Sequence, residues 1–340
     1  MAVDPRPGKP PSADPPKAGQ PSVLPVIAIF GPTAIGKTGV AIELAELLRR
    51  KGEDPVAINC DSIQVYRGLE LISGAASPED QTRLEHRLLS FVPIDQEFSS
   101  GRFGEAARGE IDSALEAGRR PILVGGTGLY LRSALSDLEM RPPVDQELRR
   151  QVELEVESRG PAALHAELPP GLSARVHPND RKRVARLTEL SRSGVDPHPD
   201  HEGGGELWTS RLRHPTLLVG LVEDDEPLVE KIHRRVGRMA GAGAGAEAER
   251  AVANGASRTV RAAIGFDEFQ NDDLERVAAL HRRYGRRQMT WMRRMEGVQL
   301  LDRTGRSDSG VAAEILELAE QVPSRVASSS KSGKRSATTT

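Results

Sequence analysis

The sequence has one cysteine, few aromatic residues and almost no net charge. The single Cys60 excludes an internal disulfide and a zinc site built from several cysteines, which is typical of a reduced, cytoplasmic setting. Aromatic residues make up only 3% of the 340 residues, so the core must consist mainly of Ala, Val, Leu and Ile. The net charge of −2 gives no global field that attracts nucleic acid, so any RNA contact must rest on local basic clusters. No apolar run approaches the roughly 20 residues that span a bilayer, and we expect no membrane attachment.

The distribution of apolar residues predicts an α/β core with a helical insertion. The Pro-rich residues 1–24 and the Ser/Thr/Lys-rich residues 323–340 are predicted to be disordered extensions. Between them, apolar runs alternate with helical patterns, which indicates a mainly parallel sheet flanked by helices, of the P-loop NTPase-like type. We place the core at residues 25–136 and 211–300 and the helical insertion at residues 137–210. The predicted strands are 26–30, 56–59, 121–126 and 216–221; the predicted helical segments are 37–50, 103–117, 145–193 and 227–296, with a loop at 196–206 and an interruption at 241–245.

A phosphate-binding loop follows the first predicted strand. Gly31-Pro-Thr-Ala-Ile-Gly-Lys-Thr38 matches GxxxxGK[ST] and opens a helix. Its glycines let backbone N–H groups turn toward an anion, and the helix N-terminus adds positive dipole character. Lys37 would neutralise a phosphate oxygen, and the Thr38 hydroxyl would hold Mg²⁺. The motif predicts a polyphosphate ligand without saying which one. The residues predicted to bind it are Gly31, Thr33, Ala34, Gly36, Lys37 and Thr38.

A carboxylate follows the second predicted strand. Asp61 falls at the carboxyl end of that strand, where ligands bind in open α/β sheets. A carboxylate there can act as a partner of Mg²⁺ or as a general base close to the phosphate. The alternative is an aspartate that only caps the following helix.

Six motifs in order resemble the tRNA dimethylallyltransferase (isopentenyltransferase) family, and they extend across residues 26–295. A phosphate loop alone is shared by many families, whereas this ordered series is shared by few. The motifs are Gly31-Pro-Thr-Ala-x-Gly-Lys-Thr38, Asp61-Ser-x-Gln-Val-Tyr-Arg-Gly68, Val124-Gly-Gly-Thr-Gly-Leu-Tyr130, Arg175-Val-His-Pro-Asn-Asp180, Ile264-Gly-Phe266 and Arg286-Arg-Gln-x-Thr-Trp291.

The resemblance implies a P-loop core related to nucleotide kinases and a helical insertion that grips the anticodon stem-loop of tRNA. It implies transfer of a dimethylallyl group from dimethylallyl diphosphate to N6 of the adenosine 3′ to the anticodon, with Mg²⁺ as cofactor and the protein as a monomer. In that pattern Asp61 is the general base, Thr127 helps to place the target base or the isoprenoid, and Arg261 joins the diphosphate site. The residues that the resemblance assigns to tRNA binding in the second motif are Ser62, Gln64 and Tyr66.

Two basic clusters also indicate RNA binding. Arginines crowd residues 282–294, where i,i+4 neighbours repel one another unless a polyanion is present. A second cluster lies at residues 175–186 of the insertion. The alternative is a solvated helix face paired with glutamates, and Trp291 can equally be a core residue. The residues predicted to contact tRNA are Arg175, His177, Asn179, Arg183, Arg286, Arg287 and Gln288.

The chain departs from the family pattern at several positions. Ser73–Pro78 lacks a usual lysine, Glu85–Ser90 replaces a His-His motif, and Ala262 stands where an arginine is common. The motif ending the insertion helix is Arg186-Leu-Thr-Glu189. These changes leave open a divergent tRNA-binding paralogue with little activity. A small-molecule kinase that uses ATP, or a prenyltransferase acting on free AMP, remains an alternative reading of the same phosphate loop.

Overall fold

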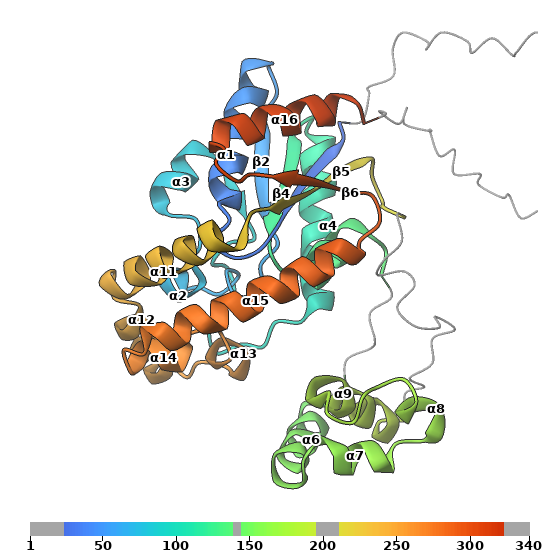
Figure 1. Ribbon diagram of the computed structural model, residues 1–340. Coiled ribbons are helices and arrows are strands. Elements are labelled where there is room, and N and C mark those ends of the chain that lie inside the picture. Colours follow the sequence, from blue (N-terminus) through green and yellow to red (C-terminus); the bar gives the residue numbers. More distant parts are fainter. Residues whose placement is uncertain (1–23, 139–143, 195–210, 323–340) are drawn as a thin grey trace, which may run out of the picture.

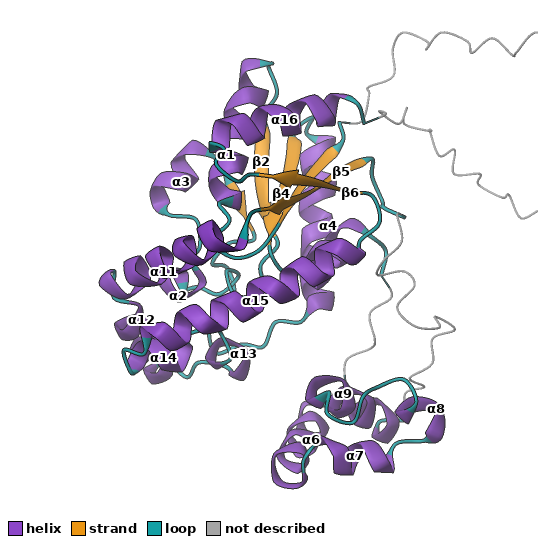
Figure 2. Cartoon of the chain, in the orientation of Figure 1, coloured by secondary structure: helices purple, strands orange, loops and turns teal. Residues whose placement is uncertain are grey.

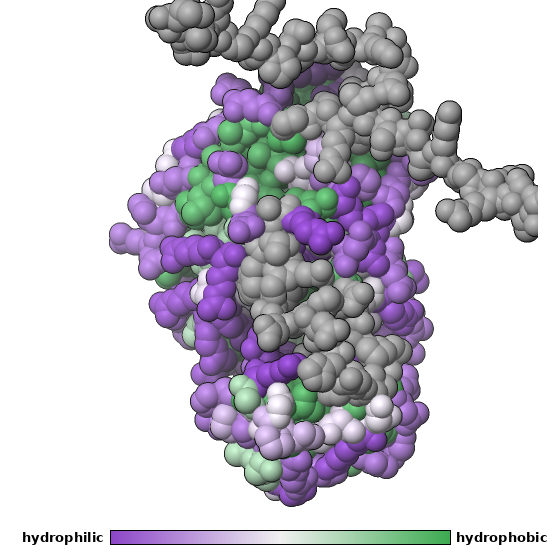
Figure 3. Space-filling view, turned by 90° about the vertical axis from the view of Figure 1, so that its right-hand side faces the viewer, coloured by the Kyte–Doolittle hydropathy of each residue, from purple (hydrophilic) through white to green (hydrophobic). Residues whose placement is uncertain are grey.

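The protein is an α/β core joined to a separate helical bundle. The computed structural model describes residues 24–138, 144–194 and 211–322 (Figure 1). The predicted terminal extensions, apart from residue 24, and the predicted loop at 196–206 lie outside these ranges. Within them, no helix is long and apolar enough to cross a membrane. The side of the molecule seen in Figure 3 is mainly hydrophilic, with a smaller hydrophobic area in its upper part.

The core contains a six-stranded sheet in the order β3-β2-β4-β1-β5-β6, and every pair in it is parallel. Ile27 in the first strand aligns with Ile122 on one side and Leu217 on the other. The parallel arrangement brings the carboxyl ends of all strands to one edge of the sheet. The strands are β1 (Val26–Phe30), β2 (Pro55–Asn59), β3 (His86–Arg87), β4 (Arg120–Gly125), β5 (Thr216–Val222) and β6 (Val298–Asp302).

Helices cover both faces of the sheet (Figure 2). Ile27 and Ile29 pack with α1 and α16, whereas Ala28 and Phe30 of the same strand belong to the cluster that includes α4 and α5. Because side chains alternate along a strand, burial on both faces explains why β1 is apolar throughout. The helices around this half of the core are α1 (Lys37–Arg50), α2 (Glu70–Ser73), α3 (Pro78–Arg83), α4 (Ser100–Glu116), α5 (Gly128–Leu135) and α16 (Asp308–Glu320).

A second group of helices lies beyond the carboxyl ends of the strands. The two longest are α11 and α15, which pack against each other. The predicted interruption is confirmed, because α11 ends at Gly241 and Gly243 takes a φ of 97° before the next helix begins. Trp291 packs partly buried against the core cluster. The helices of this group are α11 (Asp225–Gly241), α12 (Ala244–Ala253), α13 (Arg258–Arg261), α14 (Phe266–Gln270) and α15 (Leu274–Arg294).

The insertion is a small bundle with its own apolar cluster. Val152, Leu164 and Val184 lie in that cluster, which contains no residue of the sheet. The bundle is drawn apart from the sheet in Figure 1, and Glu153 forms an ion pair with Arg258 of the core. Its helices are α6 (Gln146–Arg159), α7 (Pro161–Glu167), α8 (Pro170–Ser173) and α9 (Arg181–Arg192).

The end of the core differs from the prediction. The sequence pattern indicated an end of the core at residue 300 and predicted neither β6 nor α16. In the structure β6 pairs with β5, and α16 packs along α1 on the same face of the sheet. The exposed polar residues Gln299 and Asp302 weaken the apolar pattern of β6, as expected for a strand at the edge of a sheet.

Candidate active site

A pocket of about 1140 Å³ opens at the carboxyl ends of the strands. Its wall combines the phosphate loop, the turn after β2, the segment around α2, and helices α11 and α15; residues 157, 181 and 182 of the insertion also line it. Nine Lys or Arg and four Asp or Glu lie in the wall. The pocket is therefore positively charged although the whole chain is nearly neutral, which suits an anionic ligand.

The phosphate loop takes the backbone form that its motif predicts. Ala34 and Gly36 have φ angles of 65° and 90°, and α1 begins immediately afterwards at Lys37. The Lys37 amine donates hydrogen bonds to the carbonyl oxygens of Gly31 at 3.0 Å and Pro32 at 2.9 Å. Burial lowers the pKa of Lys37 to about 8, with Asp61 acting in the opposite direction. Lys37 is thus held at the loop by backbone oxygens that an incoming phosphate can replace.

An arginine from the end of the chain supports this loop from behind. Arg303 follows β6 and is 7% exposed. Its guanidinium donates to the carbonyl oxygen of Ile35 and, at 2.9 Å, to Asp308 at the start of α16. A side chain at Gly36 would collide with that guanidinium. The two elements that sequence analysis did not predict therefore hold the phosphate loop in place.

Asp61 forms a capping turn and also lines the pocket. Its Oδ1 accepts hydrogen bonds from the backbone N–H groups of Ile63 at 2.9 Å and Gln64 at 3.4 Å, as in a capping turn. Oδ2 has no hydrogen-bond partner among the described residues, and Asp61 lines the pocket. Burial lowers the pKa values of Lys37 and Arg235, and the negative charge of Asp61 acts in the opposite direction on both. Asp61 therefore lies close enough to interact with both cations. One oxygen thus fixes the turn and the other is free to act on a ligand.

Thr127 connects the turn after β2 to helix α15. Its hydroxyl accepts a hydrogen bond from the Ser62 backbone N–H at 3.2 Å and lies 3.4 Å from the Tyr284 hydroxyl. Ser62 and Tyr284 line the pocket, whereas Thr127 lies just behind them. Thr127 is therefore placed to orient pocket residues, and its expected role in placing the target base or the isoprenoid stays a prediction.

Arg235 is one of the arginines that line the pocket, whereas Arg261, which was predicted to bind diphosphate, does not line it. Arg261 is exposed, donates to the carbonyl oxygen of Ala256 at 3.0 Å and does not line the pocket. Arg235 on α11 does line it, and burial lowers the pKa of its guanidinium. The basic run of α11 was visible in the sequence, but only the packing of α11 onto α15 shows that the buried Nε belongs to Arg235.

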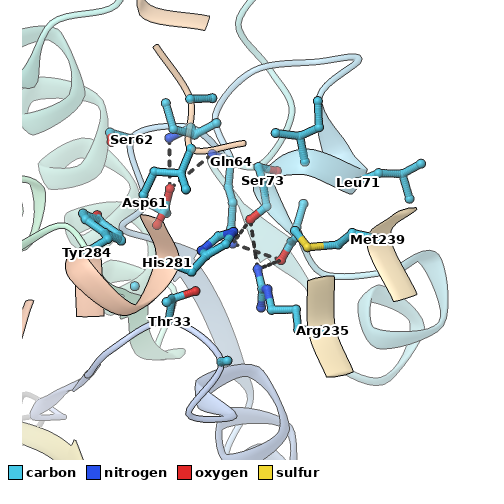
Figure 4. A pocket seen from close by; sticks show the side chains of 18 of the residues that line it. Thr33, Asp61, Ser62, Gln64, Leu71, Ser73, Arg235, Met239, His281 and Tyr284 are labelled. Atoms are coloured by element: carbon cyan, nitrogen blue, oxygen red, sulfur yellow. Dashed lines mark hydrogen bonds between the residues drawn. The ribbon is translucent and has the colours of Figure 1, made fainter. Parts of the chain in front are cut away.

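The segment around α2 is held against this arginine. The carbonyl oxygens of Ser73 and Gly74 accept hydrogen bonds from the Gln64 amide at 3.4 and 3.1 Å. The Ser73 oxygen also accepts one from Arg235 at 3.2 Å (Figure 4). Gln64, predicted to contact tRNA, thus contributes to the pocket wall. The departure from the family pattern at Ser73–Pro78 falls largely on this wall, where residues 73–77 line the pocket.

Two predicted tRNA contacts are wrong because the side chains are buried. Tyr66 is 0% exposed, and its hydroxyl accepts a hydrogen bond from the Phe98 backbone N–H at 3.2 Å. Gln288 is 4% exposed and connects two loops. Its Oε1 accepts from the Thr33 backbone N–H, and its Nε2 donates to the Gly126 carbonyl oxygen, both at 2.8 Å. Gln288 is a brace between the phosphate loop and the loop after β4.

The other predicted tRNA contacts are accessible. Within the described ranges Arg286 and Arg287 make no ion pair, and Arg287 stacks over the Tyr284 ring at 5.5 Å at the pocket rim. By contrast, arginines of α9 pair with glutamates of the bundle, for example Arg192 with Glu155 at 2.6 Å. The exposed predicted contacts in the insertion, all near the start of α9, are Arg175, His177, Asn179 and Arg183.

Comparison with known proteins agrees with this arrangement. A family model described as IPP transferase matches residues 64–295. The tRNA dimethylallyltransferase of Kineococcus radiotolerans is 34% identical over 316 residues, which cover 88% of this chain and 98% of the relative.

Solved structures extend this likeness to the fold. The tRNA isopentenylpyrophosphate transferase of Bacillus halodurans has a TM-score of 0.61 at 28% identity, covering 87% of this chain and 95% of that one. A eukaryotic dimethylallyltransferase acting on tRNA has a TM-score of 0.69 at 25% identity, covering 88% and 80%. These neighbours confirm the P-loop NTPase-like α/β fold. From its motifs, its pocket and these matches, the chain belongs to the IPP transferase family.

Proposed function

We propose that the protein transfers a dimethylallyl group from dimethylallyl diphosphate to N6 of the adenosine 3′ to the anticodon of tRNA, releasing diphosphate. The observation that carries the proposal is the free oxygen of Asp61, which lies in one pocket with Lys37 and Arg235. The relatives named tRNA dimethylallyltransferase support the choice of substrates. A phosphate loop alone would also suit a kinase, but a kinase gives no reason for an insertion that lines the same pocket.

The reaction forms one carbon–nitrogen bond and breaks one carbon–oxygen bond. The adenine amine is a weak nucleophile, so its proton must leave as N6 bonds to C1 of the dimethylallyl group. Asp61 Oδ2 accepts that proton. The C1–O bond breaks with its electron pair remaining on diphosphate, whose growing negative charge is stabilised by Lys37, Arg235 and the amides of the loop.

The pocket also suits Mg²⁺ bound together with diphosphate. The Thr38 hydroxyl lines it without a hydrogen-bond partner in the described part of the chain. No group of three or more acidic, His or Cys side chains is found there among the described residues, which suits an ion that takes most of its ligands from phosphate and water. Thr38 would hold the ion, which would neutralise charge on the leaving group, while Asp61 Oδ2 stays available for the N6 proton.

The tRNA would lie across the pocket mouth between the insertion and α15. Arg286 and Arg287 are accessible on α15, and Arg181 and Lys182 bring positive charge from the insertion to the pocket. The target adenosine must leave its stack to reach Asp61, which an RNA loop permits more readily than a duplex.

The test is prenyl transfer from labelled dimethylallyl diphosphate to unmodified tRNA with Mg²⁺. We expect label on one adenosine beside the anticodon, and a loss of roughly 10²–10⁴-fold in turnover for Asp61→Asn with diphosphate binding retained. Asp95→Asn, a change at an exposed carboxylate outside the pocket, is the matched control. Full activity of Asp61→Asn would remove this residue from the mechanism. Label on AMP, or ATP consumption without tRNA, would replace the proposal with the corresponding alternative.

A further inference from the structure

One buried histidine in the pocket makes no hydrogen bond to any residue that the structure describes. His281 lies on α15, one turn before Tyr284, and is 6% exposed. Neither ring nitrogen has a hydrogen-bond partner in the described ranges, although the residue lines the pocket. A buried polar group without a partner costs free energy, so its retention needs a reason.

Other buried or partly buried histidines of this chain show what a structural role looks like. His86 Nδ1 lies 2.6 Å from the Leu84 carbonyl oxygen. His165 Nε2 lies 3.1 Å from the carbonyl oxygen of Ser173 and 3.0 Å from that of Val176. Each has a backbone partner that fixes its ring. His281 has none and faces a cavity, so its hydrogen-bonding capacity is directed at a ligand.

The surroundings of His281 select the kind of ligand. Figure 4 draws the ring between Asp61 and Arg235, with Thr33 of the phosphate loop on its other side. Arg235 carries a second orphan, because its buried Nε also lacks a partner among the described residues. Burial and the charge of Arg235 lower the pKa of His281 to about 4. The ring is therefore neutral near pH 7 and presents one N–H donor beside a cationic donor.

We propose that His281 is a diphosphate-binding residue, whose ring N–H donates a hydrogen bond to an oxygen of the diphosphate held between the phosphate loop and Arg235. The inference rests on the proposed function for the identity of this anion. An apolar ligand would leave the His281 ring N–H and the Arg235 Nε–H unpaired, whereas a diphosphate offers acceptor oxygens to both donors at once. His281 thus completes the wall of the anion site beside Arg235.

The test is calorimetric titration of the full chain with inorganic diphosphate and Mg²⁺, without tRNA or a prenyl donor. His281→Leu should weaken the affinity by about 10- to 100-fold, the range for one hydrogen bond to a charged group. Its thermal unfolding midpoint should stay the same or rise, because the substitution removes an unpaired buried group. His281→Asn restores an N–H donor and should recover part of the affinity. His233→Leu, at a histidine of α11 that does not line the pocket, is the matched control.

The outcomes separate this inference from the function on which it rests. Absence of diphosphate binding to the unaltered protein would overturn the anion site itself. Normal diphosphate binding with equal affinity for His281→Leu would overturn only the role of His281. A lower unfolding midpoint in His281→Leu, with affinity not recovered by His281→Asn, would make the residue structural. An effect confined to tRNA affinity would assign it to the RNA instead.

Discussion

The buried brace at Gln288 gives a prediction whose magnitude follows from the structure. Gln288→Leu keeps roughly the volume of the side chain but removes both hydrogen bonds, leaving the Thr33 N–H and the Gly126 carbonyl oxygen unpaired. Each buried orphan costs about 1–3 kcal/mol. Water from the adjoining pocket can reach Thr33, so we expect a loss in the lower part of the combined range, about 2–4 kcal/mol. That is a large share of the 5–15 kcal/mol that typically stabilises a protein.

The assay is urea unfolding followed by circular dichroism, together with titration of inorganic diphosphate. The phosphate loop loses its anchor, so diphosphate affinity should fall along with the free energy of unfolding. Gln288→Glu adds a sharper comparison, because a carboxylate can accept from Thr33 but cannot donate to Gly126. Protonation of that carboxyl restores a donor, so its deficit should shrink as the pH falls. Gln151→Leu, on the exposed face of α6, should change stability by no more than about 0.5 kcal/mol.

Two results would refute this reasoning. Stability of Gln288→Leu within about 0.5 kcal/mol of the unaltered protein would show that the two hydrogen bonds do not brace the loops. Unchanged stability with weakened tRNA binding would instead return Gln288 to the RNA contact that the sequence predicted.

Three further predictions concern the phosphate loop and the RNA surface. Because Lys37 has a pKa of about 8, diphosphate affinity of the unaltered protein should fall as the pH rises through 8, and that of Lys37→Met should not. The pKa of an unfolded lysine is near 10.5, so the stability of the unaltered protein should rise with pH between 8 and 10.5, and that of Lys37→Met should not. Identical pH profiles for the two proteins, in diphosphate titration and in urea unfolding, would contradict both expectations. Gly36→Ala should lower the free energy of unfolding in urea by about 1–3 kcal/mol, because the residue has a positive φ and its new Cβ would collide with Arg303. The loss should be larger than for Gly52→Ala, where φ is also positive but the space around the residue is open. Arg286→Ala combined with Arg287→Ala should weaken tRNA binding and reduce its salt slope by about 1–2, and an unchanged slope would exclude this helix face from the RNA contact.

Residues close together in the sequence specify the local parts of this protein. The strands before the phosphate loop and before Asp61 are short apolar runs that end in turns, so they could be placed from the pattern alone. The conformation of the phosphate loop depends on residues that are neighbours in the sequence. Ala34 and Gly36 have positive φ angles, and α1 begins at Lys37, as the motif predicts. The position of Asp61 at the edge of the sheet could also be predicted, because Asp61 follows a strand and parallel strands all end at one edge.

Long-range packing brings together the side chains that meet at the pocket. Gln288 and Tyr66 belong to motifs that suggested RNA contacts, but packing buries them against residues distant in the sequence. Arg235 was one of several arginines in its helix, and His281 gave no signal in the sequence; each acquires its role from the contact between α11 and α15. Such long-range contacts bury Gln288 and Tyr66 and leave the His281 ring without a partner among the described residues. They also place Arg303 behind the phosphate loop. A local pattern specifies which elements form, whereas the desolvation and pairing of a side chain depend on what the rest of the chain places around it.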